Sequence, residues 1–151
     1  MAPAGTITGG SSTFGLAFDY NGNLYVADIG ASDFNVFAPP YTGSPTAVSS
    51  PSMYGLASYA TYLFGADAMS GAIDAYTLPV SAGASPAYVI TATDPHAVAL
   101  DGQGTLYVGD QHGGAGNGTI DVFTQPLGAA STSAYSIANG VVEPVELAVS
   151  Q

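Results

Sequence analysis

Three copies of one sequence pattern, spaced about 40 residues apart, constrain this 151-residue chain more than any other feature. Each copy has an apolar stretch, a short turn and a second apolar stretch that ends in aspartate. The copies lie at residues 14–28 (FGLAFDYNGNLYVAD), 54–67 (YGLASYATYLFGAD) and 96–110 (HAVALDGQGTLYVGD). A repeat of this length indicates units that each form one supersecondary element and bury their apolar surface against the next unit.

Each unit contains four stretches with the chemistry of β-strands. FNVFAP, IDAYTLP and IDVFTQP follow the pair described above, and PTAVSS, PAYVITA and SAYSIA come fourth. The stretches are rich in aromatic and β-branched residues, glycines mark the turns at 19–22 and 101–104, and helical periodicity is absent. Four antiparallel strands per unit are typical of a propeller blade. We therefore expect an all-β fold of β-propeller blades, with three complete blades plus partial terminal strands.

The predicted units cover about residues 12–50, 51–92 and 94–137 of a single domain, 1–151. Residues 4–10 and 143–150 are predicted to be strands of further, incomplete blades. Because a propeller closes with about four to eight blades, three blades should leave unpaired strand edges at both ends, and such edges pair readily with another chain. The predicted interface residues belong to the two terminal strands: Ile7, Thr8, Val145, Leu147 and Val149.

Association between molecules is one interpretation of these edges. Two chains would form a six-bladed ring, or chains would add head to tail into a fibre, and either product is a homo-oligomer. The alternatives are a fragment of a longer propeller and a chain that closes alone in a distorted way. Light scattering separates an oligomer from a monomer.

At the residues quoted above, the chain resembles NHL-type repeats of the bacterial form. In that pattern, P-x-G-[LIV]-A-x-D-x-x-G-N-L-Y-V-A-D is followed by V-[FY]-A-P and S-P-T segments. The first unit is the most similar, the second lacks the Asp and Gly of the first hairpin, and the third has a longer loop at 111–118. The resemblance covers nearly the whole chain and implies a propeller. The chain departs from the pattern because it has no Arg or Lys.

The resemblance also implies one enzymatic alternative. Lactone hydrolases are similar six-bladed propellers that hold a divalent metal in the channel through Glu, Asn and Asp side chains. Here Glu143 and Glu146 are the only glutamates, and both lie in the predicted terminal strand. The ligand pattern of the lactone hydrolases is therefore not recovered.

The charge of the chain excludes several partners. It has 11 acidic residues and no Lys or Arg, for a formal net charge of −11. Sequence-independent binding to nucleic acid and electrostatic docking on anionic membranes both need cationic side chains, so we expect neither partner. No apolar run approaches the roughly 20 residues of a membrane-spanning helix. Because acids without cationic partners repel one another, stability should be kept or increased near pH 4.

A surface of Ser, Thr, Gly, Asn and Tyr, with no Lys or Arg, suggests an extracellular or cell-surface protein. The N-terminus lacks the features of a signal peptide, which would imply a mature or trimmed chain. The absence of cysteine excludes disulfides and thiolate chemistry and leaves the redox compartment open.

Three aspartates recur at the end of the second strand of each unit: Asp28, Asp67 and Asp110. A ring of carboxylates could hold Ca²⁺, but one per blade places them too far apart to share an ion. We expect each to accept backbone N–H bonds in the following turn. Asp74 and Asp121, in the third strands, are predicted to face solvent or to receive a turn donor.

The two histidines are the remaining candidates for metal binding. His96 follows Asp94 and aligns with Phe14 and Tyr54 at the expected channel, where packing against aromatic neighbours is the structural alternative. His112 follows Asp110 in a glycine-rich loop. Asp110, His112, Asp94 and His96 are therefore the metal candidates that the sequence offers, and no cofactor is predicted, with Ca²⁺ as the alternative.

No catalytic motif can be assembled from these residues, so the sequence predicts that the protein is not an enzyme. The predicted function is a non-catalytic, self-associating structural or interaction scaffold. The alternatives are a glycan- or protein-binding propeller module, whose ten tyrosines and six phenylalanines could stack on sugars, and a fragment of a lactonase-like metal-dependent hydrolase.

Overall fold

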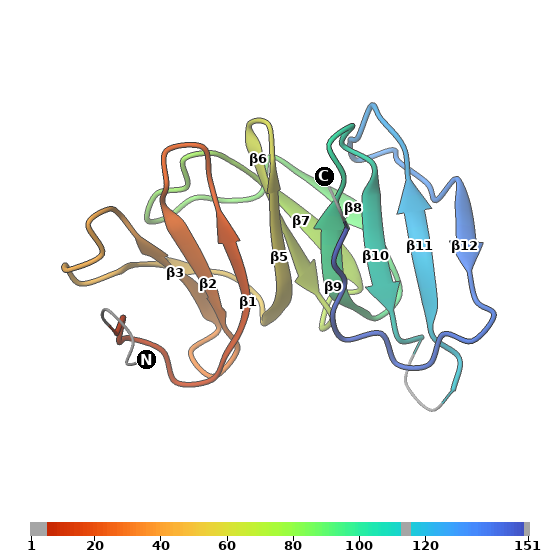
Figure 1. Ribbon diagram of the computed structural model, residues 1–151, viewed down its shortest axis with the longest axis horizontal. Coiled ribbons are helices and arrows are strands. Elements are labelled where there is room, and N and C mark those ends of the chain that lie inside the picture. The colour runs from red at the N-terminus through yellow and green to blue at the C-terminus, as the bar shows by residue number, and fades with distance from the viewer. Residues whose placement is uncertain (1–5, 113–115, 150–151) are drawn as a thin grey trace.

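The computed structural model describes residues 6–112 and 116–149, and in these ranges it contains twelve β-strands and no helix (Figure 1). The first sheet consists of β1 (Thr13–Phe18), β2 (Leu24–Asp28), β3 (Asp33–Phe37) and β4 (Thr46–Ser49). The second consists of β5 (Met53–Tyr59), β6 (Tyr62–Asp67), β7 (Ala72–Thr77) and β8 (Tyr88–Thr91). The third consists of β9 (Pro95–Leu100), β10 (Leu106–Asp110), β11 (Thr119–Phe123) and β12 (Tyr135–Ile137).

Each repeat forms one antiparallel sheet whose strands lie in chain order. This confirms the predicted fold class of three four-stranded propeller blades, which we call blades 1, 2 and 3. The aromatic and β-branched residues of each strand pair with those of the next, and short turns connect the strands. Within the described residues, no helix offers the length and apolarity needed to cross a membrane.

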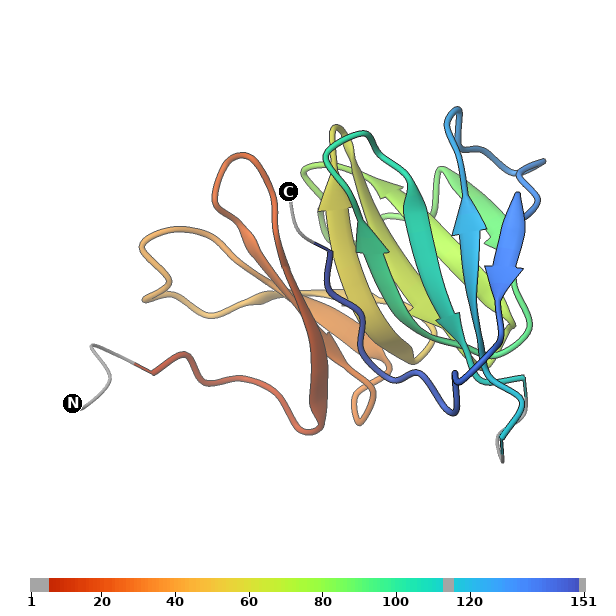
Figure 2. The ribbon, with the colours of Figure 1, turned by 45° about the vertical axis from the view of Figure 1, so that its right-hand side comes forward.

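The blades stand side by side with their first strands together (Figures 1 and 2). β5 contacts both β1 and β9, so these three form the inner edge of the stack. Glycine is required where they approach most closely: a Cβ atom on Gly15 would lie 2.5 Å from the carbonyl oxygen of Tyr54. A Cβ atom on Gly55 would lie 2.9 Å from the Cα atom of Ala97.

Two apolar cores lie between neighbouring blades. Every blade has a front face and a back face because side chains alternate along its strands. The front faces carry the equivalent residues Leu16, Leu56 and Val98, and the back faces carry Val48, Ile90 and Ile137. The back of blade 1 packs on the front of blade 2, and the back of blade 2 packs on the front of blade 3. The burial of apolar side chains on these faces is the main contribution to the stability of the fold.

The chain termini differ from the prediction. Neither 6–10 nor 143–149, the described parts of the predicted terminal strands, forms a strand. A strand needs a partner for its backbone groups, and the described chain offers no further blade at either end. Residues 143–149 instead lie beside blade 3, where Pro144 approaches Gly109. The first terminal segment lies near blade 1, where Gly9 approaches Phe37 and Pro45.

Candidate functional site

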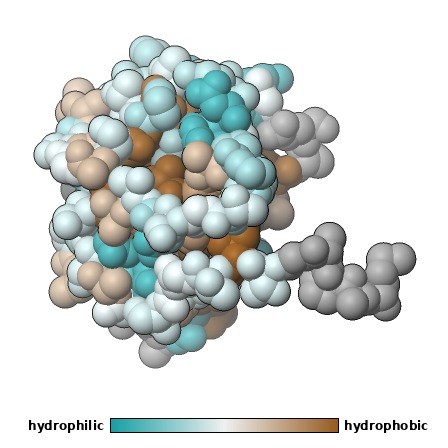
Figure 3. All heavy atoms as spheres, turned by 90° about the vertical axis from the view of Figure 1, so that its left-hand side faces the viewer, coloured by the Kyte–Doolittle hydropathy of each residue, from teal (hydrophilic) through white to brown (hydrophobic). Residues whose placement is uncertain are grey.

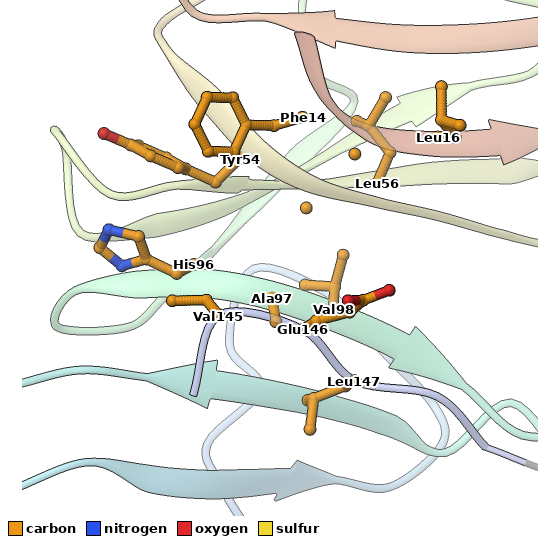
Figure 4. Close-up of a pocket in the computed structure, with 12 residues that line it drawn as sticks. Phe14, Leu16, Tyr54, Leu56, His96, Ala97, Val98, Val145, Glu146 and Leu147 are labelled. Carbon is orange, nitrogen blue, oxygen red and sulfur yellow. The ribbon is translucent and has the colours of Figure 1, made fainter. Parts of the chain in front are cut away.

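A groove with a volume of about 440 Å³ follows the inner strands of the three blades (Figure 4). Its walls come from equivalent positions of β1, β5 and β9, together with the segment that follows blade 3. Phe14, Tyr54 and His96 form one end, and Leu16, Leu56 and Val98 continue along the strands. Val145, Glu146 and Leu147 form the wall beside blade 3.

One end of the groove carries a row of three rings. The ring centroids of Phe14 and Tyr54 are 5.2 Å apart in an edge-to-face arrangement, and those of Tyr54 and His96 are 4.4 Å apart. The Nδ1 atom of His96 lies 3.1 Å from the carbonyl oxygen of Asp94. Because a carbonyl oxygen only accepts hydrogen bonds, Nδ1 donates to it. In the neutral ring, Nε2 is therefore the acceptor, so the row combines aromatic faces with one basic nitrogen.

The histidine lies where the sequence expected it, in line with the aromatic residues of the other blades. Its Nδ1 atom is also 3.5 Å from a carboxylate oxygen of Asp94. Within the described residues, this end of the groove brings no third metal-ligating side chain to the pair. Glu146, the one acidic residue among the lining residues, is drawn apart from His96 in Figure 4.

The recurring aspartates at the ends of the second strands are buried and act as acceptors for backbone N–H groups. This is the structural role considered for them above. The donors in the following turn, as predicted, are Gly30 for Asp28, Met69 and Ser70 for Asp67, and His112 for Asp110. Four further donors, which the prediction did not include, precede the first strand of their blade: Ser11 and Ser12 for Asp28, and Thr93 and Asp94 for Asp110. Bonds from the backbone N–H groups of Ser11 and Ser12 lower the pKa of Asp28.

One of the two environments predicted for Asp74 was exposure to solvent, and the structure contradicts it. Its side chain lies on the front face of blade 2, opposite Gly65 in the strand pairing, and the residue is only 5% exposed. Burial and the nearby charge of Asp67 raise the pKa of Asp74 to about 6. The prediction failed because strand alternation identifies the face of a residue, whereas the neighbouring blade determines whether that face meets water.

Asp121 receives a donor from its own blade, which was the second predicted alternative. The Thr119 hydroxyl donates to its Oδ1 atom over 3.1 Å. The structure also brings Asp121 close to Asp110 and His112, and the ligand atoms of the three lie within 4.8 Å of one another. From the sequence, Asp110 and His112 are predicted as metal candidates, and Asp121 is not predicted to lie near them. The pairing of β10 with β11 supplies the missing signal, because Asp121 lies opposite Val108, two residues before Asp110.

Both ends of the stack expose apolar positions that are buried elsewhere in the chain. On the front face, Leu16 of blade 1 is 61% exposed, whereas its equivalents Leu56 and Val98 are each 6% exposed. On the back face, Ile137 of blade 3 is 43% exposed, whereas its equivalents in the other blades are fully buried. Figure 3 shows apolar residues gathered on the face of the molecule at the blade 1 end.

Of the predicted interface residues, Thr8 is exposed, and Ile7 and Val145 are exposed apolar residues. Leu147 and Val149 are partly exposed. All five lie in irregular segments beside the end blades, not in strands.

No family model matches the chain, and no curated protein matches its sequence. Solved structures share its fold. Hydrazine synthase from Kuenenia stuttgartiensis matches 89% of this chain and 38% of its own, with a TM-score of 0.72 at 16% identity. A candidate 6-phosphogluconolactonase from Bacteroides uniformis matches 99% of this chain and 51% of its own, with a TM-score of 0.73 at 16% identity. Virginiamycin B lyase from Staphylococcus aureus matches 79% of this chain and 43% of its own, with a TM-score of 0.55 at 11% identity.

The chain thus spans about half or less of the length of these propeller-like proteins. At such low identity the likeness shows the fold alone, and it does not distinguish NHL-type repeats from other propeller blades. All three neighbours are named for reactions, a synthase, a lactonase and a lyase, and they contradict the prediction that this protein is not an enzyme. That prediction relied on missing local motifs, whereas a fold of this kind can build an active site from residues far apart in sequence.

Proposed function

We propose that the chain works as half of a six-bladed propeller, in which two copies close a ring around the groove of their inner strands. The front of blade 1 in each copy would meet the back of blade 3 in the other. The observation that carries this proposal is the exposure of Leu16 and Ile137 at positions that the other blades bury. Each internal blade interface is thus a template for the contact between copies.

The chemistry of the two open faces suits this pairing. Phe18 lies next to Leu16 on the front of blade 1 and is also exposed, while Tyr135 accompanies Ile137 on β12. Val145, from the segment beside blade 3, adds further exposed apolar surface. Exposed apolar patches on a folded protein mark sites of interaction with another molecule.

The experiment measures the mass of the particle in solution by light scattering over a series of concentrations. The ring predicts a single species of twice the chain mass of 15.0 kDa. Leu16→Glu should shift it to the monomer, because a charge would be buried in the contact. Met69→Glu is the matched control, since Met69 is exposed in the β6–β7 turn of the middle blade and should leave the dimer intact.

Circular dichroism melting curves check that both variants fold. A 15.0 kDa monomer at all concentrations would overturn the pairing of the faces. A mass that grows continuously with concentration would contradict the closed ring, because the faces would then pair without closing.

A second function is favoured by the exposed rings in the groove. Phe14 is exposed and Tyr54 is half-buried, so the faces of their rings are available for stacking on a sugar or another flat, uncharged ligand. Tyr54→Ala should abolish a signal on an array of neutral glycans, whereas Tyr20→Ala, in the turn after β1, should keep it. Equal signals from the two variants, or no signal from the unaltered chain, would contradict this function.

A further inference from the structure

Three metal-ligating side chains converge at one end of blade 3. Asp110 ends β10, His112 follows in the loop, and Asp121 lies in β11. One ligand atom of each lies within 4.8 Å of the other two, the one such group among the residues that the structure describes. Asp110 is fully buried, Asp121 is half-buried and His112 is exposed, so solvent reaches the group from one side.

Hydrogen bonds orient the imidazole of His112 toward this group. Its Nε2 atom lies 2.8 Å from the Thr119 hydroxyl, and that hydroxyl donates its only proton to Asp121. The hydroxyl oxygen must therefore accept, so Nε2 carries a proton and donates it. In the neutral ring, Nδ1 is left with a lone pair, and it lies 3.8 Å from Oδ1 of Asp110. Backbone N–H groups of Thr93, Asp94 and His112 hold the Asp110 carboxylate in place beside this lone pair, and a cation between the two would be attracted by both.

The other two blades do not contain the same set. Blade 1 has Gly30 and Asn35 at the positions of His112 and Asp121, and blade 2 has Met69 and Asp74. Blades 1 and 2 therefore form their β2–β3 and β6–β7 connections without a histidine. The histidine of blade 3 is an addition that the fold of the repeat does not require.

We propose that Asp110, His112 and Asp121 bind a divalent transition metal of the Zn²⁺ class. The ligands would be Nδ1 of His112 and one carboxylate oxygen from each aspartate. Zinc bonds of about 2.0–2.2 Å to nitrogen and oxygen place ligand atoms up to about 4 Å apart, so the side chains need to move inward by less than 1 Å. Thr119 would serve as the outer partner that holds the imidazole in place.

The charge and the ligand types decide which metal is favoured. The chain carries a net charge of −11 without any Lys or Arg, so its field attracts cations. Imidazole suits zinc and its neighbours in the first transition row, whereas Ca²⁺ prefers six to eight oxygen ligands. We therefore expect this site to select Zn²⁺ over Ca²⁺.

The test is isothermal titration calorimetry of the full chain with ZnCl₂, using protein that carries no polyhistidine tag. One Zn²⁺ should bind per chain, and His112→Ala should weaken the affinity about tenfold or more. Asp121→Asn should also weaken it, and asparagine fits the strand because blade 1 has Asn35 there. The matched control is His96→Ala, because His96 also lies beside an aspartate but has no third ligand among the described residues.

His96→Ala should change the affinity less than twofold, and CaCl₂ should produce no binding that depends on His112. The proposal is overturned if His112→Ala binds Zn²⁺ as well as the unaltered chain does, since His112 would then only pair with Asp110. Equal losses in the two histidine variants would also overturn it, because they would indicate diffuse binding to the acidic surface. Far-ultraviolet circular dichroism verifies that each variant is folded.

Discussion

Replacing Asp74 by asparagine should stabilise this protein at neutral pH. Asp74 lies on the face of blade 2 that packs against blade 1 and is 5% exposed. Burial, with a further contribution from the charge of Asp67, raises its pKa from 3.8 to about 6. Its charged form is therefore disfavoured in the folded state. Asparagine removes that charge and keeps the shape, and blade 1 already has Asn35 at the equivalent position.

The magnitude follows from the pKa. A raised carboxyl pKa means that the folded state binds more protons than the unfolded state between about pH 4 and 6. The free energy of unfolding therefore falls as the pH rises through this window, and the loss is complete above pH 6. One step in pKa corresponds to about 1.4 kcal/mol, so the charge of Asp74 costs at most about 3 kcal/mol at pH 7. Asp74→Asn should recover most of this.

The assay is urea denaturation of both proteins at a series of pH values from 4 to 8. The unaltered chain should become less stable as the pH rises from 4 to 7, and the variant should show a much flatter profile. The two stabilities should converge near pH 4, where Asp74 is protonated in the folded state. Equal stability at pH 7, or a difference between the variants that grows toward pH 4, would refute the reasoning.

Asp19 provides a control of opposite sign. Burial alone would raise its pKa, but hydrogen bonds from Asn23, Tyr25 and Asn21 outweigh this effect and lower the pKa. A lowered pKa means that the charged carboxylate stabilises the fold above its unfolded pKa and that this contribution disappears in acid. Asp19→Asn should therefore destabilise the protein at pH 7, with a smaller difference near pH 3. If both asparagine variants moved in the same direction, charge would not be the cause.

Two further substitutions test the contacts between blades. Tyr25→Phe removes a buried hydroxyl that donates to Asp19 over 3.0 Å and accepts the N–H of Val80 from blade 2 over 3.2 Å. It should lower the free energy of unfolding by about 1–3 kcal/mol in urea titrations, and a change below about 0.5 kcal/mol would contradict the role of these two bonds. Gly55→Ala places a Cβ atom 2.9 Å from the backbone of Ala97 and should destabilise the protein by roughly 1–3 kcal/mol. Gly43→Ala meets no atom within 4 Å and should be nearly neutral, and thermal melts of both variants measure the difference. Equal melting temperatures for the two alanine variants would show that the inner strands do not need glycine.

Much of the fold could be predicted because each blade is built from local information. Aromatic and β-branched stretches alternate with turns three times over, so strands such as β2, β6 and β10 lie where the repeat predicted them. The alignment of Phe14, Tyr54 and His96 also followed from the repeat, since equivalent positions of stacked blades face the same way. The hydrogen bonds that the strand-end aspartates accept from the turns that follow them also followed from turn chemistry.

The candidate site depended on contacts between strands and blades that no local pattern describes. The sequence alone determined that this chain forms repeated four-stranded units without a cationic side chain, because strand and turn preferences act over a few neighbouring residues. Only the tertiary structure decided that Asp74 is buried, that Asp121 approaches His112 and that the terminal segments do not form strands. The environments of Asp74 and Asp121 depend on which faces of the blades and which strands lie against each other. The terminal segments would form strands only if a neighbouring strand were present to accept and donate their backbone hydrogen bonds. Both conditions are decided when the blades pack together.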